Sequence, residues 1–241
     1  MMPGANVVLL RVGIDSGSGG MQGPLFQDRS FELVPIPDSS NLGLRTYGNT
    51  IGIKGVPLSD YFPSGRRQQQ VGQAMHLDPE FEQFTYGDPT RPKAGLRKLQ
   101  AGDMLVFYAG LEGWDHHSPP ALYIVGYFVV EWAGLAASLP EDEVRQRCGT
   151  NFHVMHEPVF RAQRDRLVLV KGGAGSRLLS RAHCISARAA NRDGQALKVL
   201  SQDAQEVFSD FGGRISIQRS PPRWVPASHV NRARAFVESL P

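Results

Sequence analysis

The sequence has little cysteine: Cys148 and Cys184 are the only two in 241 residues. Two cysteines cannot hold together a small disulfide-rich domain, and they cannot complete a four-cysteine zinc site. The sequence also lacks the G-x-S-x-G motif of many serine hydrolases. Charged residues make up 20% of the chain and hydrophobic residues 41%, which excludes a collagen, a coiled coil and a wholly disordered protein.

Long apolar segments are scarce as well. The longest, residues 121–139, contains Glu131 and is flanked by prolines on both sides. Its first part is rich in β-branched and aromatic residues, which indicates a buried strand followed by a loop or short helix rather than a membrane span. The apolar run at 7–10 is too short for a signal peptide. We therefore expect a cytoplasmic protein with no membrane partner.

The net charge is only +3, but it is unevenly distributed. Residues 1–160 carry 12 basic and 17 acidic side chains, a net −5, whereas residues 161–241 carry 14 and 6, a net +8. A basic C-terminal third suits an anionic partner such as the phosphate backbone of a nucleic acid. Because arginine outnumbers lysine 21 to 5, a bias in composition explains the same charges without any partner.

Glycine (26) and proline (17) are abundant and favour many turns and short strands over a helical bundle. Hydrophobic patterns predict strands at 7–14, 31–36, 75–77, 104–108, 121–132, 152–155 and 166–170. They predict helices at 141–148, 196–211 and 228–240, and leave strand or helix open at 178–185. Because strands and helices do not alternate regularly, we expect an α+β fold: a mostly antiparallel sheet, twisted or partly closed, with a few flanking helices. We expect a single domain over 1–241, with a helical C-terminal extension at about 196–241.

Two short stretches carry side chains suited to acid–base chemistry. Residues 15–20 (DSGSGG) follow a predicted strand, so their backbone amides can face an anion while Asp15 acts as a base or metal ligand. The loop matches neither a Walker A loop nor GxGxxG, and a tight turn closed by the Asp15 side chain is the simpler interpretation.

His76 and Asp78 lie two residues apart on a short predicted strand, where they can form a His–Asp pair or bind a metal. The alternative is that Asp78 caps a turn and His76 is a surface residue.

Residues 103–132 combine a Gly-Asp turn, two predicted strands and several aromatic residues. The pattern looks like the paired strands of PUA-like barrels, the group that includes ASCH and EVE domains, which bind RNA or modified bases. Tyr108, Trp114 and Tyr123 would then stack on a base, although aromatic residues in such strands more often belong to the core.

Residues 171–177 (KGGAGSR) place Lys171 and Arg177 around a glycine-rich turn in the basic third. Backbone amides and the two cations can converge on one phosphate, or the loop is a simple turn between strands with solvated charges.

The remaining histidines give a weaker signal for a metal site, because the ligand-type cluster at 115–117 (DHH) has no second cluster at a recognisable spacing. The sequence therefore predicts no metal site.

Motifs in a fixed order connect these stretches. They are IDSGSGG at 14–20, PL at 24–25, LVPIP at 33–37, YG at 47–48, HLDP at 76–79, GD at 102–103, LVFY at 105–108, IVGY at 124–127, NFH at 151–153, LVLVKG at 167–172 and SRLL at 176–179. In this order they resemble a DNA base hypermodification family, the third type of nucleotide-modification-associated domain, over residues 7–185. The opening loop departs from the family pattern, because Ser16-Gly17-Ser18 stands where an asparagine is usual.

The resemblance implies a protein that hypermodifies a base of DNA or another nucleic acid, or a nucleotide. From their residues, we expect the glycine-rich loops at 15–20 and 171–177 to bind phosphate. If it is an enzyme, a base-modifying transferase is indicated; the cofactor and the oligomeric state stay unknown. The predicted catalytic residues are His76, as general base or acid, with Asp78 and Asp15. The alternative is a PUA-like reader that binds a modified base without catalysis. The predicted substrate-binding residues are Ser16, Gly19, Gly20, Asp103, Tyr108, Trp114, Asn151, His153, Lys171, Gly172, Ser176 and Arg177.

Overall fold

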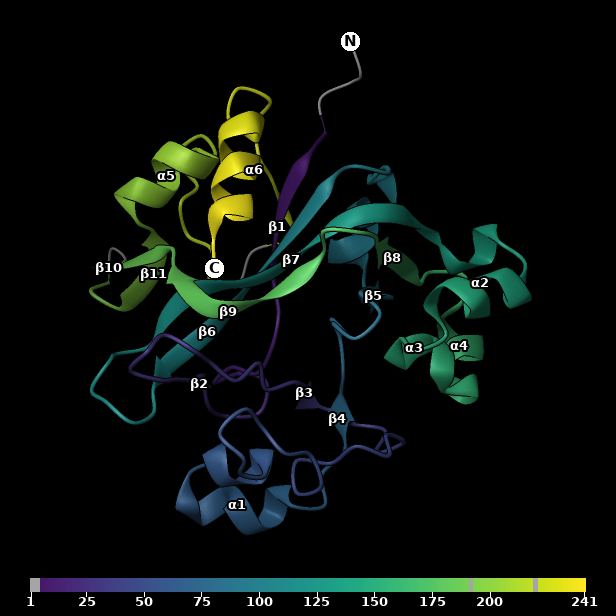
Figure 1. The fold of residues 1–241 in the computed structure, drawn as a ribbon, viewed down its shortest axis with the longest axis horizontal. Coiled ribbons are helices and arrows are strands. Elements are labelled where there is room, and N and C mark those ends of the chain that lie inside the picture. Colours follow the sequence, from purple (N-terminus) through teal and green to yellow (C-terminus); the bar gives the residue numbers. More distant parts are fainter. Residues whose placement is uncertain (1–4, 191–192, 219–220) are drawn as a thin grey trace.

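One large sheet organises the computed structural model, which describes residues 5–190, 193–218 and 221–241 (Figure 1). Within these residues eight strands join the sheet in the order β12-β1-β6-β7-β8-β5, with β2 beside β6 and β9 beside β7. Their bounds are β1 (Val7–Arg11), β2 (Gly23–Leu25), β5 (Thr85–Asp88), β6 (Met104–Gly113), β7 (Ala121–Leu135), β8 (Val168–Gly172), β9 (Arg177–Cys184) and β12 (Arg223–Trp224).

The middle of this sheet is buried on both faces. Residues 104–111 of β6 are all buried, as are 122–128 of β7, which explains why these strands read as continuous apolar runs rather than alternating ones. β6 and β7 pair antiparallel, and so do β7–β8, β7–β9, β5–β8 and β1–β12; β1 and β2 run parallel to β6. The expected mostly antiparallel sheet is confirmed. Over the residues that the structure describes, the sheet does not close into a barrel, so the PUA-like interpretation is unconfirmed.

Helices cover the two ends of the sheet (Figure 1). α5 (Gln202–Phe208) and α6 (Val230–Ser239) lie at one end, and α2 (Glu141–Cys148), α3 (Phe152–Met155) and α4 (Glu157–Gln163) lie at the other. The other elements are α1 (Ser64–Gln70), the 3₁₀ helices η1 (Leu58–Tyr61), η2 (Arg91–Lys98) and η3 (Ala136–Ser138), and two small sheets, β3 (Ile36–Pro37) with β4 (Met75–His76) and β10 (Ser186–Ala190) with β11 (Ala196–Leu200).

The apolar segment at 121–139 forms β7 followed by η3, as the sequence predicts. In the described parts of the chain, no helix combines the length and apolar character that crossing a bilayer requires.

Two predicted elements are wrong, one at 152–155, beside the candidate site, and one at 196–211, in the C-terminal part of the chain. The predicted strand at 152–155 is the helix α3, because the side chain of Asn151 accepts the backbone N–H of His153 and caps a helical turn. The predicted helix at 196–211 is the strand β11 followed by α5: β11 pairs with β10, and Ser201 caps α5. The expected helical extension therefore contains strands as well as helices.

The predicted strand at 31–36 is also wrong over most of its length. Phe31 makes one isolated bridge, and β3 begins only at Ile36. The segment at 178–185, left open from the sequence, is the strand β9.

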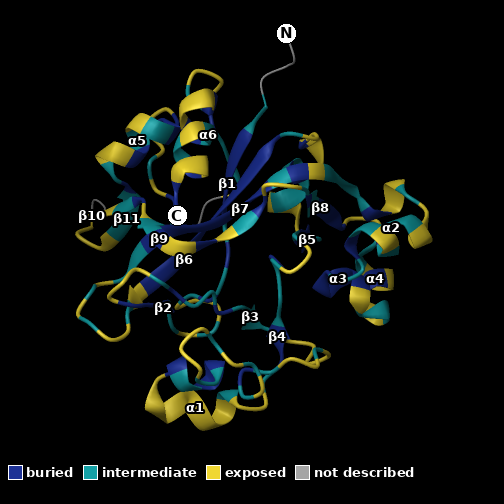
Figure 2. Ribbon diagram, in the orientation of Figure 1, coloured by how far each residue is buried: buried dark blue, intermediate teal, exposed yellow. Residues whose placement is uncertain are grey.

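Three apolar clusters support the site described below. The largest fills both faces of the sheet and includes residues of α5 and α6. The second is built largely from residues of the segment at 47–62, which includes η1, and also contains Met75; the third joins α2, α3 and α4 to β8 and includes Val154. Figure 2 shows the central strands buried and α1 largely exposed. Met75 and Val154 anchor the neighbouring residues His76 and His153, so two separate cores position the two histidines.

Candidate functional site

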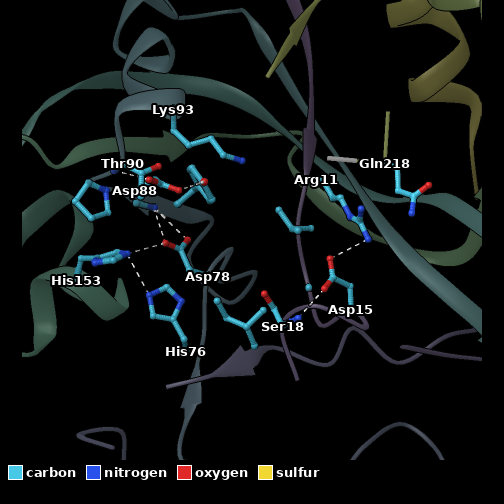
Figure 3. Close-up of a pocket in the computed structure, with 16 residues that line it drawn as sticks. Arg11, Asp15, Ser18, His76, Asp78, Asp88, Thr90, Lys93, His153 and Gln218 are labelled. Atoms are coloured by element: carbon cyan, nitrogen blue, oxygen red, sulfur yellow. Dashed lines mark hydrogen bonds and ion pairs between the residues drawn. The ribbon is translucent and has the colours of Figure 1, made fainter. Parts of the chain in front are cut away.

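A cavity of about 440 Å³ lies where β1, β4, β5, η2 and α3 meet (Figure 3). Its volume falls within the range of about 300–1,000 Å³ that is usual for small-molecule sites. Its lining is rich in polar and titratable side chains: Arg11, Asp15, Ser18, His76, Asp78, Tyr86, Asp88, Thr90, Lys93, His153 and Gln218.

His76, Asp78 and His153 form a compact group on one wall. Nε2 of His76 lies 3.2 Å from Nε2 of His153, and Nε2 of His153 lies 3.5 Å from Oδ2 of Asp78. The Gly87 amide donates to both Asp78 oxygens at 3.1 and 2.9 Å, and the Asn151 side chain reaches Oδ1 at 3.5 Å. The HLDP and NFH motifs, far apart in the sequence, thus meet in space, and three imidazole or carboxylate groups face one point.

Burial shifts the pKa of all three groups towards their neutral forms. It lowers the pKa of His76 to about 4, an effect that the neighbouring His153 reinforces, and it also lowers the pKa of His153. It raises the pKa of Asp78 well above the usual carboxyl range, although the amide of Gly87 opposes this shift. The predicted general-base role of His76 assumed an ordinary pKa near neutrality; that premise does not hold here, and the role itself stays a prediction.

Gln163, at the end of α4, fixes the orientation of the His153 ring. Its Oε1 lies 2.7 Å from Nδ1 of His153, so Nδ1 carries a proton and donates it to the amide oxygen. Nε2 of His153 is then left with its lone pair, pointing at His76 and Asp78. Nδ1 of His76 is buried and has no hydrogen-bond partner within the described chain. In this tautomer the contact with Gln163 sets the direction of the Nε2 lone pair of His153.

Asp15 forms part of the opposite wall, where two interactions occupy its carboxylate. Oδ1 accepts the backbone amides of Gly17 and Ser18, both at 2.7 Å, and Oδ2 pairs with Arg11 at 2.9 Å. The loop at 15–20 is thus closed by its own aspartate, the arrangement that the sequence indicated as the simpler one. Gly20, also hydrogen-bonded to the Asp15 carbonyl, has a φ of +78°, which favours glycine there. Ser16 and Gly19 lie in the same closed turn.

Sequence reasoning missed two cations beside this cavity. Arg11 was available as a signal, because it is the one charged residue in an otherwise apolar strand. Lys93 comes from η2, and Figure 3 shows its ammonium group directed into the space between Asp88 and Arg11. Burial lowers the pKa of Lys93, a shift that the nearby carboxylates of Asp88 and Asp78 oppose, and no carboxylate oxygen lies within 4.0 Å of its ammonium among the described residues. Gln163 was also missed, because its contact with His153 depends on how α3 and α4 fold together.

The glycine-rich loop at 171–177 lies outside this cavity. Lys171 donates to the backbone carbonyl of Gln83, and Arg177 donates to a tyrosine hydroxyl at 3.2 Å and to backbone carbonyls at the end of α6. The Ser176 hydroxyl accepts a backbone amide of β7 at 3.0 Å, and Gly172 belongs to β8. The structure brings Asp15 and His76 to one cavity but does not bring Lys171 to it, and phosphate binding by this loop stays a prediction.

Three other predicted substrate-binding residues have structural contacts away from the cavity. Asp103 is buried and accepts the backbone amide of Asn6 at 2.6 Å. Tyr108 is 0% exposed in the core, so its ring offers no free face for stacking on a base. Trp114 is 46% exposed and packs edge-on against Tyr61, with ring centroids 5.2 Å apart. The structure therefore does not bring these aromatic rings together around the candidate site.

The donor atoms of His76, Asp78 and His153 all lie within 4.8 Å of one another, and this group could hold a metal ion. Two imidazoles and a carboxylate can also exchange protons with a bound molecule. Lys93 and Arg11 on the same cavity suit an anionic ligand. The cavity thus combines titratable groups with two cationic side chains.

A family model described as nucleotide modification associated domain 3 matches residues 6–239. A search of curated proteins and a search of solved structures gave no significant match. The match confirms the resemblance that the ordered motifs indicated and extends it from residues 7–185 to nearly the whole sequence. On this evidence the chain belongs to the nucleotide modification associated domain 3 family.

Proposed function

We propose that this protein modifies a nucleic-acid base or a nucleotide in the cavity that holds His76, Asp78 and His153, with DNA as the favoured substrate. Membership of the family indicates a role in nucleic-acid modification. The observation that carries the proposal is the arrangement of that cavity, where three titratable groups face a space of about 440 Å³ that also contains Lys93. A nucleobase would lie against the wall formed by His76, Asp78 and His153, and the phosphate of the same nucleotide would lie beside Lys93.

Lys93 supports the placement of the phosphate. Arg11 already pairs with Asp15, whereas Lys93 has no ion-pair partner in the described chain and faces the cavity. An anion would therefore neutralise the charge of Lys93 without breaking an existing ion pair. Lys171 and Arg177, which lie outside the cavity, are the candidates for contacts with the backbone of a longer nucleic acid.

The reader alternative has less support. A reader would recognise a modified base with an aromatic cage, but Tyr108 is in the core and Trp114 packs on Tyr61. Converging titratable groups, in contrast, are the feature expected of a catalytic site.

Mass analysis of nucleosides tests the proposal. Cells that naturally carry the gene would be compared with a deletion strain restored with the wild-type gene, with His153→Gln or with the matched control His183→Gln. His183 lies on β9, outside the cavity. We expect one modified nucleoside to disappear on deletion, to return with the wild type and the control, and to stay absent with His153→Gln. Identical nucleosides in all four strains would refute the proposal.

A pair of lysine variants tests where the anion binds. A nucleoside monophosphate should bind Lys93→Ala about 10-fold or more weakly than the wild type, which corresponds to one lost charge-assisted hydrogen bond. Lys171→Ala should bind it as the wild type does. If Lys171→Ala weakened binding and Lys93→Ala did not, the phosphate site would be the glycine-rich loop at 171–177 and not the cavity.

A further inference from the structure

We propose that His76, Asp78 and His153 bind one divalent first-row transition-metal ion, with further coordination positions open to the cavity. The sequence left metal binding by His76 and Asp78 as an open alternative and predicted no metal site; the fold adds His153, which lies 77 residues from His76 in the sequence. The role of the ion rests on the proposed function, since its open positions face the proposed substrate. Its binding can be measured without any substrate.

The spacing of the donor atoms supports the site. At metal–ligand distances of about 2.0–2.1 Å, neighbouring ligands of a tetrahedral or octahedral ion lie about 2.8–3.4 Å apart. The two Nε2 atoms are 3.2 Å apart, and Nε2 of His153 is 3.5 Å from Oδ2 of Asp78. No separation within the group exceeds 4.8 Å, so closure on one ion needs only a small side-chain adjustment.

The burial of Asp78 is an independent observation. Its side chain is 2% exposed, and no lysine or arginine nitrogen lies within 4.0 Å of it in the described chain. A buried carboxylate is unfavourable unless it is paired with a cation or coordinates a metal. An ion between Asp78 and the two histidines would place a positive charge in direct contact with this carboxylate.

The types of the three ligands, and the hydrogen bond that orients one of them, indicate which metal ions would bind. Nδ1–H of His153 donates to Gln163, the contact that typically orients a metal-binding histidine and leaves Nε2 free to coordinate. Two imidazoles with one carboxylate suit zinc, iron(II), cobalt or nickel, whereas Mg²⁺ and Ca²⁺ prefer oxygen ligands. The cavity beside the group leaves room for water or substrate to complete the coordination shell.

Metal titration of the full chain tests this proposal. After dialysis against a chelator, Co²⁺ would be followed by its visible absorption, and Zn²⁺ would then be added as a competitor. We expect one Co²⁺ per chain, displacement by one equivalent of Zn²⁺, and no displacement by excess Mg²⁺. Asp78→Asn and His153→Gln should weaken binding by at least about 100-fold, beyond the loss typical of changes in outer contacts. The control His183→Gln should bind as the wild type does.

Absence of stoichiometric binding by the wild type, or unchanged binding by both ligand variants, would overturn the proposal. If the variants do not fold, the histidine ring signals of the ¹⁵N-labelled wild type decide the question. Zn²⁺ should shift the signals of His76 and His153 among the seven histidines, and shifts confined to other histidines would refute the assignment. Nucleotide binding measured without metal is a separate readout, so the metal proposal and the proposed function can fail independently.

Discussion

Replacing Gly87 by alanine should disturb the candidate site directly. Gly87 lies in β5, and its amide holds the Asp78 carboxylate at 2.9 and 3.1 Å. An added Cβ would lie 2.7 Å from Oδ1 of Asn151, 3.0 Å from Cδ2 of His153 and 3.1 Å from Cδ2 of Leu169. All three atoms belong to packed side chains, so one or more of them must move.

The size of the effect follows from these contacts. Forcing one extra methyl group into a packed interior costs about 1–3 kcal/mol of unfolding free energy. Displacement of Asn151 and His153 should also weaken metal binding by about 10–100-fold, the loss usual when groups that orient ligands are disturbed. The stability effect is measured by urea unfolding followed by circular dichroism, and the binding effect by Co²⁺ titration.

Gly95→Ala is the matched control. Gly95 lies in η2, and a Cβ built there meets no atom within 4 Å. Its substitution should change the unfolding free energy by no more than about 0.5 kcal/mol and leave metal binding unchanged. A Gly87→Ala protein with the stability and Co²⁺ affinity of the wild type would refute the packing described here.

Two further predictions concern cysteine reactivity and a buried turn. Burial raises the pKa of Cys148 to about 12, whereas Cys184 is exposed, so a thiol reagent at pH 8 should label one cysteine per native chain and two after unfolding; two labelled thiols in the native protein would contradict this burial. Asp103→Ala should lower the unfolding free energy by about 2–3 kcal/mol, because the backbone amides of Asn6 and Gln100 lose a buried, charged acceptor. Nucleotide affinity should not change in that variant, and a selective loss of affinity would restore Asp103 as a substrate-binding residue.

The sequence predicted the central elements because their signals are local. The apolar runs of β6 and β7 and the acidic start of α2 each depend on neighbouring residues alone. The error at 152–155 has a local cause too: the run FHVM has the composition of a strand, but Asn151 caps it into a helix. At 196–211 the helical pattern at the start of the segment is overridden by pairing between β10 and β11.

The candidate site was predicted in part. HLDP and NFH were both identified, and His76, Asp78 and Asp15 do line one cavity. The contact between His76 and His153 could not be predicted, because it depends on two separate cores that bring β4 and α3 together. Lys93 was missed because a single lysine in a polar segment carries no periodic or motif signal, and only the fold of η2 directs it into the cavity.

The claim that this cavity binds the substrate can be tested most directly with a crystal structure of the protein with a nucleoside monophosphate. We predict that the base lies beside His76, Asp78 and His153 and that the phosphate lies within hydrogen-bond distance of Lys93. A nucleotide bound instead at the glycine-rich loop of Lys171, with the cavity containing only water, would contradict this account.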